Sequence, residues 1–341
     1  MPWALVLSDG KPGHENQSIG VLPKGLAHRV FPVTFHGRGA RLRASLAARL
    51  RWRALAGRFP WHGLIGDGAG LMALAAERPS VVVSAGSGPA PINLLLARHL
   101  RVPAVTCMTP SVGLGGFDLA LVPRHDHPPD RPNVVVTLGA PNRVDPDTLR
   151  AEGEAFRARH GLPQGRYAVL LMGGDSARFR IGVAQGLAAL EGCLALAARH
   201  GMELLVTTSR RTAPDTEAAM AALAHRCAYF CAGRDDPERV VPGMLALAEL
   251  AVVTEDSVSM VSEAASAPAR VLALGVERKG GVPRRHEAVL AALADGGYVR
   301  RATTTDLIAA GSALLAAAPP PRLDDTARCR AAVARLIGVA P

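Results

Sequence analysis

Strand-length runs of consecutive apolar residues recur along the whole chain, and longer helix-compatible stretches separate them. Uninterrupted apolar runs, unlike alternating ones, are typical of strands that helices cover on both faces, as in parallel sheets. The pattern therefore predicts an α/β chain of two consecutive Rossmann-like, doubly wound domains. The predicted strands are residues 3–7, 31–35, 81–84, 104–108, 119–122, 134–138, 168–172, 204–207, 228–231, 251–254 and 271–274.

The length of 341 residues also favours two domains. A polar, helix-compatible stretch with Pro and Gly at its ends, residues 141–165, is a candidate linker region. We therefore expect an N-terminal domain over 1–145 and a C-terminal domain over 146–320. Residues 321–341, which follow a run of prolines, are expected to form a last helix that packs back on the first domain.

The net charge of +10 has an unusual origin, because only three of the 39 basic residues are lysines. Such an excess of arginine is more typical of a GC-rich genome than of selection for a phosphate backbone. The chain has no zinc-finger spacing, no aromatic RNA-binding strand and no basic helix with a heptad repeat, so nucleic acid is not an expected partner. A phosphorylated small molecule or an anionic membrane surface suits a basic protein equally well.

The five cysteines are scattered and have no His or Cys partners at zinc spacing, so we expect core thiols in a reducing cytoplasm and no metal site. The apolar start of the chain meets Asp9 and Lys11 almost at once and is too short for a signal peptide. No stretch reaches the apolar length of a membrane span. The expected location is cytoplasmic. The sequence does not predict an oligomeric state.

Polar groups are dense directly after the first predicted strand, in Ser8-Asp9-Gly10-Lys11-Pro12-Gly13-His14-Glu15-Asn16-Gln17. Ligands of doubly wound sheets bind beyond the carboxyl ends of the strands, where such loops lie. Asp9, His14 and Glu15 are three proton acceptors near one helix start and are the catalytic candidates. The alternative is an ordinary connection between strand and helix. Candidate substrate-binding residues of this loop are Gly10, Gly13, Asn16 and Gln17.

A second loop of small residues, 84–89, follows the strand 81–84 and precedes a helix. Gly86, Ser87 and Gly88 could form an anion pocket at the helix N-terminus or simply a tight turn. In the second half, Gly173 and Gly174 follow a buried strand, where main-chain N–H groups can face a phosphate. This diglycine lacks the lysine of a Walker A loop and does not fit a dinucleotide fingerprint.

In the second half of the chain, arginines follow two of the predicted strands closely. Arg178 and Arg180 follow the diglycine, and Ser209, Arg210 and Arg211 follow the strand 204–207. Arginine pairs bind diphosphates through forked, charge-assisted hydrogen bonds. Any one of these arginines could equally be a solvated surface residue.

The stretch Thr254-Glu255-Asp256-Ser257-Val258-Ser259-Met260-Val261-Ser262-Glu263 follows another predicted strand. Asp256 or Ser257 can cap the helix that follows and leave first-turn N–H groups for a phosphate. Ser259 and Glu263 lie four residues apart and share one helical face, where a carboxylate could accept both ribose hydroxyls. The alternative is a capped helix with a solvated glutamate.

Three of these motifs, 8–17, 209–212 and 256–264, resemble a bacterial family of glycosyltransferase-like proteins related to a plant mitochondrial-fission protein. The resemblance runs from the first loop to at least Gly275. It implies a glycosyltransferase-B (GT-B) fold, in which two Rossmann-like domains face each other across a cleft. In this fold the second domain would bind the nucleotide-sugar donor and the first would bind the acceptor. It also implies no need for a metal or other cofactor, because helix N-termini and arginines stabilise the leaving diphosphate.

Carried over to this chain, the resemblance implies that the phosphates are contacted by Gly173, Gly174, Arg210 and Arg211. It implies contacts from the first turn of the following helix through Ser257, Ser259 and Met260. Glu263 would bind the ribose. The chain departs from the family pattern at Glu255, where a smaller uncharged residue is expected. A carboxylate at this place would repel a diphosphate.

Seven arginines and no acidic residue lie between positions 38 and 58, interleaved with Leu42, Leu46 and Leu50. Read as a helix, the leucines form one stripe flanked by cations, which could dock on anionic lipid headgroups. The alternative is a core-packed helix with a solvated cationic face.

Together these features predict transfer of a sugar from a nucleotide-diphosphate donor to a cell-envelope acceptor, a lipid or an oligosaccharide, with Asp9 or His14 as the base. The protein would be cytoplasmic and peripheral on the inner face of the membrane. Two alternatives remain open at this point. One is a nucleotide-sugar epimerase of the same fold, and the other is a non-catalytic adaptor that recruits partners to a membrane.

Overall fold

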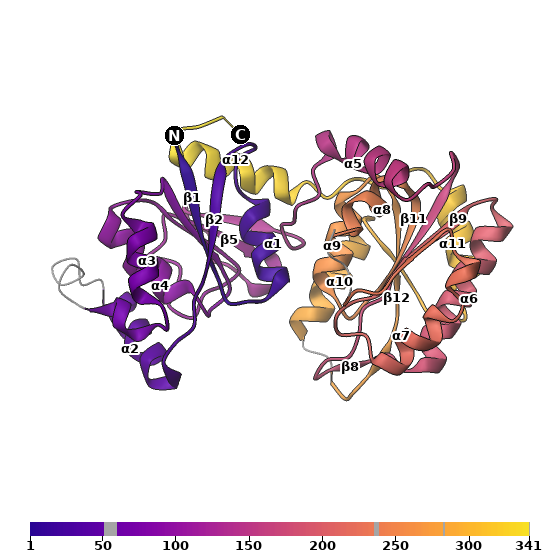
Figure 1. The fold of residues 1–341 in the computed structure, drawn as a ribbon, viewed down its shortest axis with the longest axis horizontal. Coiled ribbons are helices and arrows are strands. Elements are labelled where there is room, and N and C mark those ends of the chain that lie inside the picture. Colours follow the sequence, from indigo (N-terminus) through magenta and orange to yellow (C-terminus); the bar gives the residue numbers. More distant parts are fainter. Residues whose placement is uncertain (51–59, 235–238, 282–283, 341) are drawn as a thin grey trace. The chain divides into compact units, whose positions relative to one another are not determined.

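The computed structural model describes residues 1–50, 60–234, 239–281 and 284–340, and it divides the chain into two compact units (Figure 1). Unit 1 comprises Met1–Arg143 and Asp324–Pro341, and unit 2 comprises Val144–Leu323. Each unit is built on one six-stranded parallel sheet. The predicted α/β architecture with two doubly wound domains is therefore confirmed.

The sheet of unit 1 has the order β2-β1-β3-β4-β5-β6. Its strands are β1 (Trp3–Ser8), β2 (Ala27–Pro32), β3 (Val81–Ala85), β4 (Ala104–Cys107), β5 (Leu119–Pro123) and β6 (Val134–Thr137). Its helices are α1 (Pro12–Gly20), α2 (Gly37–Arg49), α3 (Gly68–Ala75), α4 (Ala90–Leu100) and α12 (Asp325–Ile337), with short 3-10 turns at Trp61–Leu64 and Arg124–Asp126.

Both faces of this sheet are buried, which explains the uninterrupted apolar runs. Leu5 and Leu7 of β1 pack with residues of α2, α3 and α4 on one face. Ala4 and Val6 pack on the other face with Cys329 and Val333 of α12. The last helix is thus part of the core of unit 1, and its buried Asp325 carboxylate accepts the backbone N–H groups of residues 138 and 139.

The sheet of unit 2 has the order β10-β9-β7-β11-β12-β14. Its strands are β7 (Tyr167–Leu171), β9 (Glu203–Thr207), β10 (Tyr229–Cys231), β11 (Ala248–Thr254), β12 (Arg270–Leu274) and β14 (Arg300–Ala302), and a separate antiparallel pair is β8 (Phe179–Arg180) with β13 (Glu277–Arg278). Its helices are α5 (Pro146–Arg159), α6 (Val183–Arg199), α7 (Pro214–Ala221), α8 (Val241–Leu247), α9 (Val258–Ser266), α10 (Arg284–Asp295) and α11 (Leu307–Ala316), with a 3-10 turn at Ala224–Arg226.

One predicted strand is displaced in the structure, and three short strands were not predicted. The second strand was expected at residues 31–35 and lies at Ala27–Pro32. It is an edge strand whose side chains, except that of Phe31, are exposed, so it has no apolar signal. The edge strand β14 and the β8–β13 pair were not predicted, because they are two or three residues long and contain mostly charged side chains.

Candidate functional site

The central strands of unit 2 bring three of the predicted loops together. Strands β9, β7 and β11 are direct neighbours in the parallel sheet. The loops that follow them therefore leave the same carboxyl edge, which is where ligands bind in doubly wound sheets. Figure 1 shows β9, β11 and β12 in this sheet, with α9 beside them.

Hydrogen bonds connect these loops directly. The N–H of Gly173, after β7, donates to Thr254 Oγ1, at the end of β11, over 2.7 Å. The hydroxyl of Thr212, in the loop after β9, donates to the carbonyl of Gly173 over 2.6 Å. The N–H of Asp175 donates to the carbonyl of Arg211 over 2.9 Å. The three loops therefore meet at one spot.

The diglycine is required by close packing between the loops. A Cβ atom on Gly174 would lie 2.1 Å from the carbonyl carbon of Arg211, and one on Gly173 would lie 2.0 Å from Asp256 Oδ1. The sequence predicted that the N–H groups of Gly173 and Gly174 bind a phosphate. In the structure these N–H groups donate to Thr254 and Asp256 instead, so this prediction is wrong. The two glycines are needed for the close packing of the loops.

Asp256 is the centre of this cluster. Its side chain is completely buried and accepts hydrogen bonds from Thr254 Oγ1 at 2.7 Å, from the Gly174 N–H at 3.1 Å and from Arg211 Nη2 at 2.7 Å. Arg211 also donates to the carbonyl of Gly174. Arg211 is therefore engaged in joining two loops. The neighbouring Arg210 is exposed and makes no hydrogen bond or ion pair with any other residue that the structure describes.

Helix α9 begins beside this cluster without a side-chain cap. Ser257 occupies the N-cap position, yet its side chain makes no hydrogen bond to the first turn. The expected capping by Asp256 or Ser257 is therefore wrong, because the Asp256 carboxylate is turned toward Gly174 and Arg211. Neither the Asp256 nor the Ser257 side chain accepts from the first-turn N–H groups at residues 258–260, which lie at the positive end of the helix dipole. Ser259, Met260 and Glu263, all partly exposed, follow on this helix.

Glu255 does not bring an uncompensated charge to the site. Its buried carboxylate forms ion pairs of 3.0 Å with Arg278 and with Arg301, and both arginines also pair with Glu287. The expected repulsion of a diphosphate is therefore removed by two guanidinium groups. These arginines, like Thr212 and Thr254, were not among the predicted site residues. The only signal for Thr254 was a hydroxyl at the end of a buried strand. Thr212 belongs to the motif 209–212 but was not singled out, and nothing in the sequence marked the two arginines.

Arg178 has a different role from the one that its position in the sequence indicated. It precedes β8, and its Nη1 donates to the carbonyl of Gly281 over 3.3 Å. Arg180 belongs to β8 itself and pairs in register with Glu277 of β13. These two arginines support the β8–β13 pair and do not belong to the Asp256 cluster.

In unit 1 the first predicted loop is shorter than expected. Helix α1 starts at Pro12, so only Asp9–Lys11 form the turn, and Gly13, Asn16 and Gln17 are helical. Gly10 has φ of +78° as expected, whereas Gly13 does not have a positive φ. Gln17 is buried, which removes it as a substrate ligand.

The short turn places His14 against Asp9. The Nδ1 atom of His14 lies 3.1 and 3.0 Å from the two carboxylate oxygens of Asp9, and Lys11 Nζ lies 3.1 Å from Oδ2. Burial raises the pKa of Asp9, but the hydrogen bond from Lys11 and the charges of His14 and Lys11 outweigh burial and leave this pKa below its ordinary value. A carboxylate that holds Nδ1 leaves Nε2 of the same ring for proton transfer. Glu15 is a partner of the Ser8 hydroxyl, at 3.3 Å.

The second predicted loop packs on this His14–Asp9 dyad. Gly86 has φ of +75°, and a Cβ atom there would lie 2.8 Å from His14 Cε1. A Cβ atom on Gly88 would lie 3.1 Å from the Cβ of Asp9. The carbonyl of Ser87, between them, accepts a hydrogen bond from Arg41 of α2. Small residues are therefore needed here to leave room for the dyad.

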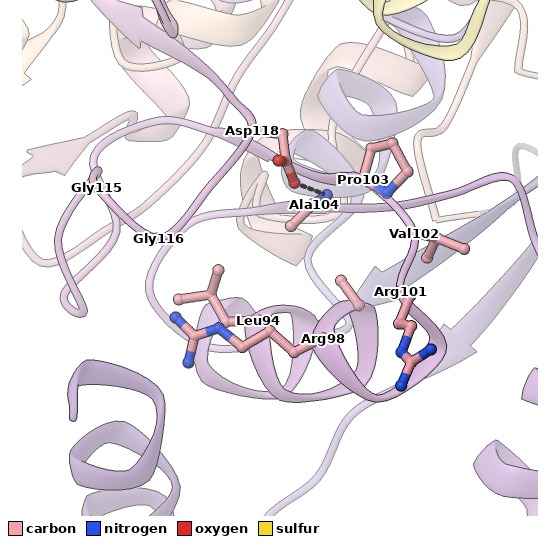
Figure 2. A pocket seen from close by; sticks show the side chains of 10 residues that line it. Leu94, Arg98, Arg101, Val102, Pro103, Ala104, Gly115, Gly116 and Asp118 are labelled. Atoms are coloured by element: carbon pink, nitrogen blue, oxygen red, sulfur yellow. Dashed lines mark hydrogen bonds between the residues drawn. The ribbon is translucent and has the colours of Figure 1, made fainter. Parts of the chain in front are cut away.

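A pocket of about 900 Å³ in unit 1 lies away from these loops. Figure 2 shows it between the end of α4, with Arg98 and Arg101, and the segment around Gly116. Asp118 accepts the N–H of Ala104 at the first residue of β4, so the pocket lies at the amino edge of the sheet. Because ligands of such sheets bind at the opposite edge, we do not assign the site to this pocket.

Across the described ranges, no group of three or more His, Cys, Asp and Glu side chains is arranged to hold a metal ion. No helix in the same part of the chain is long and apolar enough to span a bilayer.

Two Rossmann-like domains, each built on a six-stranded parallel sheet, are the architecture of the GT-B fold. The chain belongs to the mitochondrial fission ELM1 family, whose model matches residues 12–337. This confirms the resemblance seen in the sequence. No curated protein sequence matches the chain.

Two solved structures share the fold over the whole chain, and a third is similar at a lower TM-score. The UDP-GlcNAc 2-epimerase of Methanocaldococcus jannaschii is 12% identical over 98% of this chain and 99% of its own, with a TM-score of 0.57. The MnaA–UDP structure of S. aureus is 13% identical over 100% and 98%, with a TM-score of 0.53. The spinosyn rhamnosyltransferase SpnG complexed with thymidine diphosphate is 15% identical over 99% and 96%, with a TM-score of 0.48.

Proposed function

We propose that this protein is a glycosyltransferase that moves a sugar from a nucleotide-diphosphate donor to an acceptor of the cell envelope, a lipid or an oligosaccharide. Unit 2 binds the donor, and unit 1 carries the base and receives the acceptor. The observation that carries the proposal is the meeting of the loops after β7, β9 and β11 beside the uncapped start of α9.

The groups at this edge of unit 2 suit a diphosphate. The first-turn amides of α9 and the guanidinium of Arg210 supply hydrogen-bond donors and positive charge. Asp256 and Arg211 hold the loops in place, and Glu263 lies farther along α9, where we assign it to the ribose hydroxyls. Because cationic and helix-terminal groups stabilise the leaving diphosphate, we propose that the transfer needs no divalent metal.

The His14–Asp9 dyad of unit 1 suits deprotonation of an acceptor hydroxyl. Asp9 fixes the imidazole through Nδ1, so we assign His14 as the base and Asp9 as its positioning residue. The sequence alone did not distinguish these two residues. The similarity of the fold to the UDP-GlcNAc 2-epimerase and to the MnaA–UDP structure supports nucleotide-sugar chemistry.

The proposal is tested with a panel of nucleotide-diphosphate sugars, each incubated with the protein with and without a bacterial lipid extract as the acceptor. We expect release of nucleoside diphosphate that depends on the extract and persists in EDTA. His14→Gln should abolish release, and His28→Gln, a change on the exposed edge strand β2, should not.

Other outcomes would overturn the proposal. A change of the sugar without any acceptor would identify an epimerase. Failure to bind any nucleotide sugar would favour the non-catalytic adaptor. Loss of release in EDTA would contradict the metal-independent mechanism.

A further inference from the structure

Helix α2 of unit 1 turns its large apolar side chains away from the core. Leu42, Leu46 and Leu50, which follows the helix directly, are 61%, 50% and 60% exposed. The buried side of α2 consists of small residues, Ala44, Ala47 and Ala48, and this side packs toward α4 (Figure 1). An ordinary surface helix has the reverse arrangement, with its leucines inside. The three leucines lie four residues apart, so they form one continuous stripe.

Arginines surround this stripe. Arg38, Arg41, Arg43 and Arg49 are exposed on the same helix, and the chain contains no acidic residue between Glu15 and Asp67. By their helical positions, Arg43 flanks one side of the leucines and the other three arginines flank the opposite side. The structure thus excludes the core-packed alternative for the leucines. Residues 51–59, with the other arginines of the predicted basic stretch, lie outside the described residues.

A hollow of about 360 Å³ opens on the arginine side of the stripe. Its walls include Arg38, Arg41 and Arg49, with Leu42, Leu46 and the loop residue Ser111. Arg49 donates to the carbonyl of Ser111 and Arg41 donates to that of Ser87, so both guanidinium groups are held in place. A cationic hollow next to exposed leucines suits a phosphate headgroup with its acyl chains alongside.

We propose that the outer face of α2, Arg38–Leu50, docks unit 1 on a bilayer that contains anionic phospholipid. The arginines contact headgroup phosphates, and the leucine stripe enters the boundary between headgroups and acyl chains. Cations without leucines would suit nucleic acid, and leucines without cations would suit a protein partner. The combination, with no acidic residue on this face, suits an anionic lipid surface.

This surface adjoins the candidate catalytic dyad. Arg41 binds the carbonyl of Ser87, and the next residue, Gly88, packs against Asp9. Docking through α2 therefore brings a headgroup close to the loop that borders the dyad. The inference stands independently of the proposed transferase activity, because vesicle binding is measured without donor or acceptor.

The test is co-sedimentation of the full chain with vesicles of phosphatidylcholine alone and of phosphatidylcholine with 30% phosphatidylglycerol. We expect binding to the anionic vesicles that weakens as salt is raised, and little binding to the neutral ones. A double variant, Arg38→Gln with Arg43→Gln, should bind about 25-fold more weakly, since each arginine near an anionic surface contributes about fivefold.

A second variant isolates the apolar contribution. Leu42→Ser with Leu46→Ser should weaken vesicle binding at least about tenfold at every salt concentration. Because both side chains are exposed, the thermal unfolding of the variant should match that of the wild type. The matched control, Arg150→Gln with Arg300→Gln, removes the same charge from exposed positions in unit 2 and should leave vesicle binding unchanged.

Three results would overturn the inference. They are equal binding to neutral and anionic vesicles, equal loss of binding in the control pair, and retention of binding in both α2 variants. Binding of RNA or of a protein through α2, without vesicle binding, would assign this face to another class of partner.

Discussion

Replacing Asp256 by asparagine should destabilise unit 2, because one buried carboxylate holds three groups from three loops. The asparagine side chain has the same shape but only one oxygen for the donors of Thr254, Gly174 and Arg211, and its NH₂ group faces at least one of them. A buried donor left unpaired costs about 1–3 kcal/mol. The side chain of Arg211 is 41% exposed, so water can solvate its guanidinium group, and the loss of its ion pair with residue 256 adds little to the cost. We therefore expect a loss of about 2–4 kcal/mol.

The aromatic residues allow the two units to be followed separately. All three tryptophans lie at or before position 61 and belong to unit 1, whereas all three tyrosines, Tyr167, Tyr229 and Tyr298, belong to unit 2. In urea, Asp256→Asn should shift the unfolding transition seen by tyrosine fluorescence or far-ultraviolet circular dichroism. The transition seen by tryptophan fluorescence should stay in place.

The control is Asp295→Asn, which removes a carboxylate from an exposed position at the end of α10. It should change stability by less than about 0.5 kcal/mol. If Asp256→Asn also stayed within that limit, the carboxylate would not be holding the loops together. A shift of the tryptophan transition alone would likewise refute the reasoning.

Three further changes test the remaining parts of the site. Gly174→Ala should lower nucleotide affinity at least about tenfold in calorimetry, because the added Cβ would lie 2.1 Å from Arg211, whereas Gly165→Ala, which has open space around it, should have no effect. Glu263→Ala should weaken nucleotide binding by about 1–3 kcal/mol, and unchanged affinity for every bound nucleotide would remove its ribose role. Asp9→Asn should lower kcat with donor affinity unchanged. The pKa of Asp9 in the folded protein lies below its ordinary value of 3.8. Its contribution to the stability of unit 1 should therefore be constant above about pH 5 and be lost only as pH falls through that lowered pKa. A stability difference between Asp9→Asn and wild type that changes near neutral pH would contradict this.

Much of the fold could be predicted because each buried parallel strand is a continuous apolar run in the sequence. The run at Val81–Ala85 is apolar because both faces of β3 are covered, and most inner strands are found within a residue or two. The edge strands β6 and β10 were also found within a residue, but the edge strands β2 and β14 lack such an apolar run. The strand β14, Arg300–Ala302, is charged and was missed, and β2 was placed several residues too late.

The candidate site could be located from the sequence, but its internal bonding could not. Each loop was recognisable from its polar residues after a strand. Which donors remain for a ligand depends on partners far apart in the chain. Asp256 engages Gly174, 82 residues earlier, and Glu255 is neutralised by Arg301, 46 residues later. The same holds for the choice between Asp9 and His14, which depends on the side-chain geometry of a three-residue turn.

The most direct test of the central claim is hydrogen–deuterium exchange of the full chain with and without saturating nucleoside diphosphate, using UDP, thymidine diphosphate and other bases in turn. We predict that at least one of them slows exchange at the start of α9, residues 258–260, and in the loops 173–175 and 208–212. The pocket shown in Figure 2 should be unaffected. Protection confined to other parts of the chain, or no protection by any nucleoside diphosphate, would contradict the account.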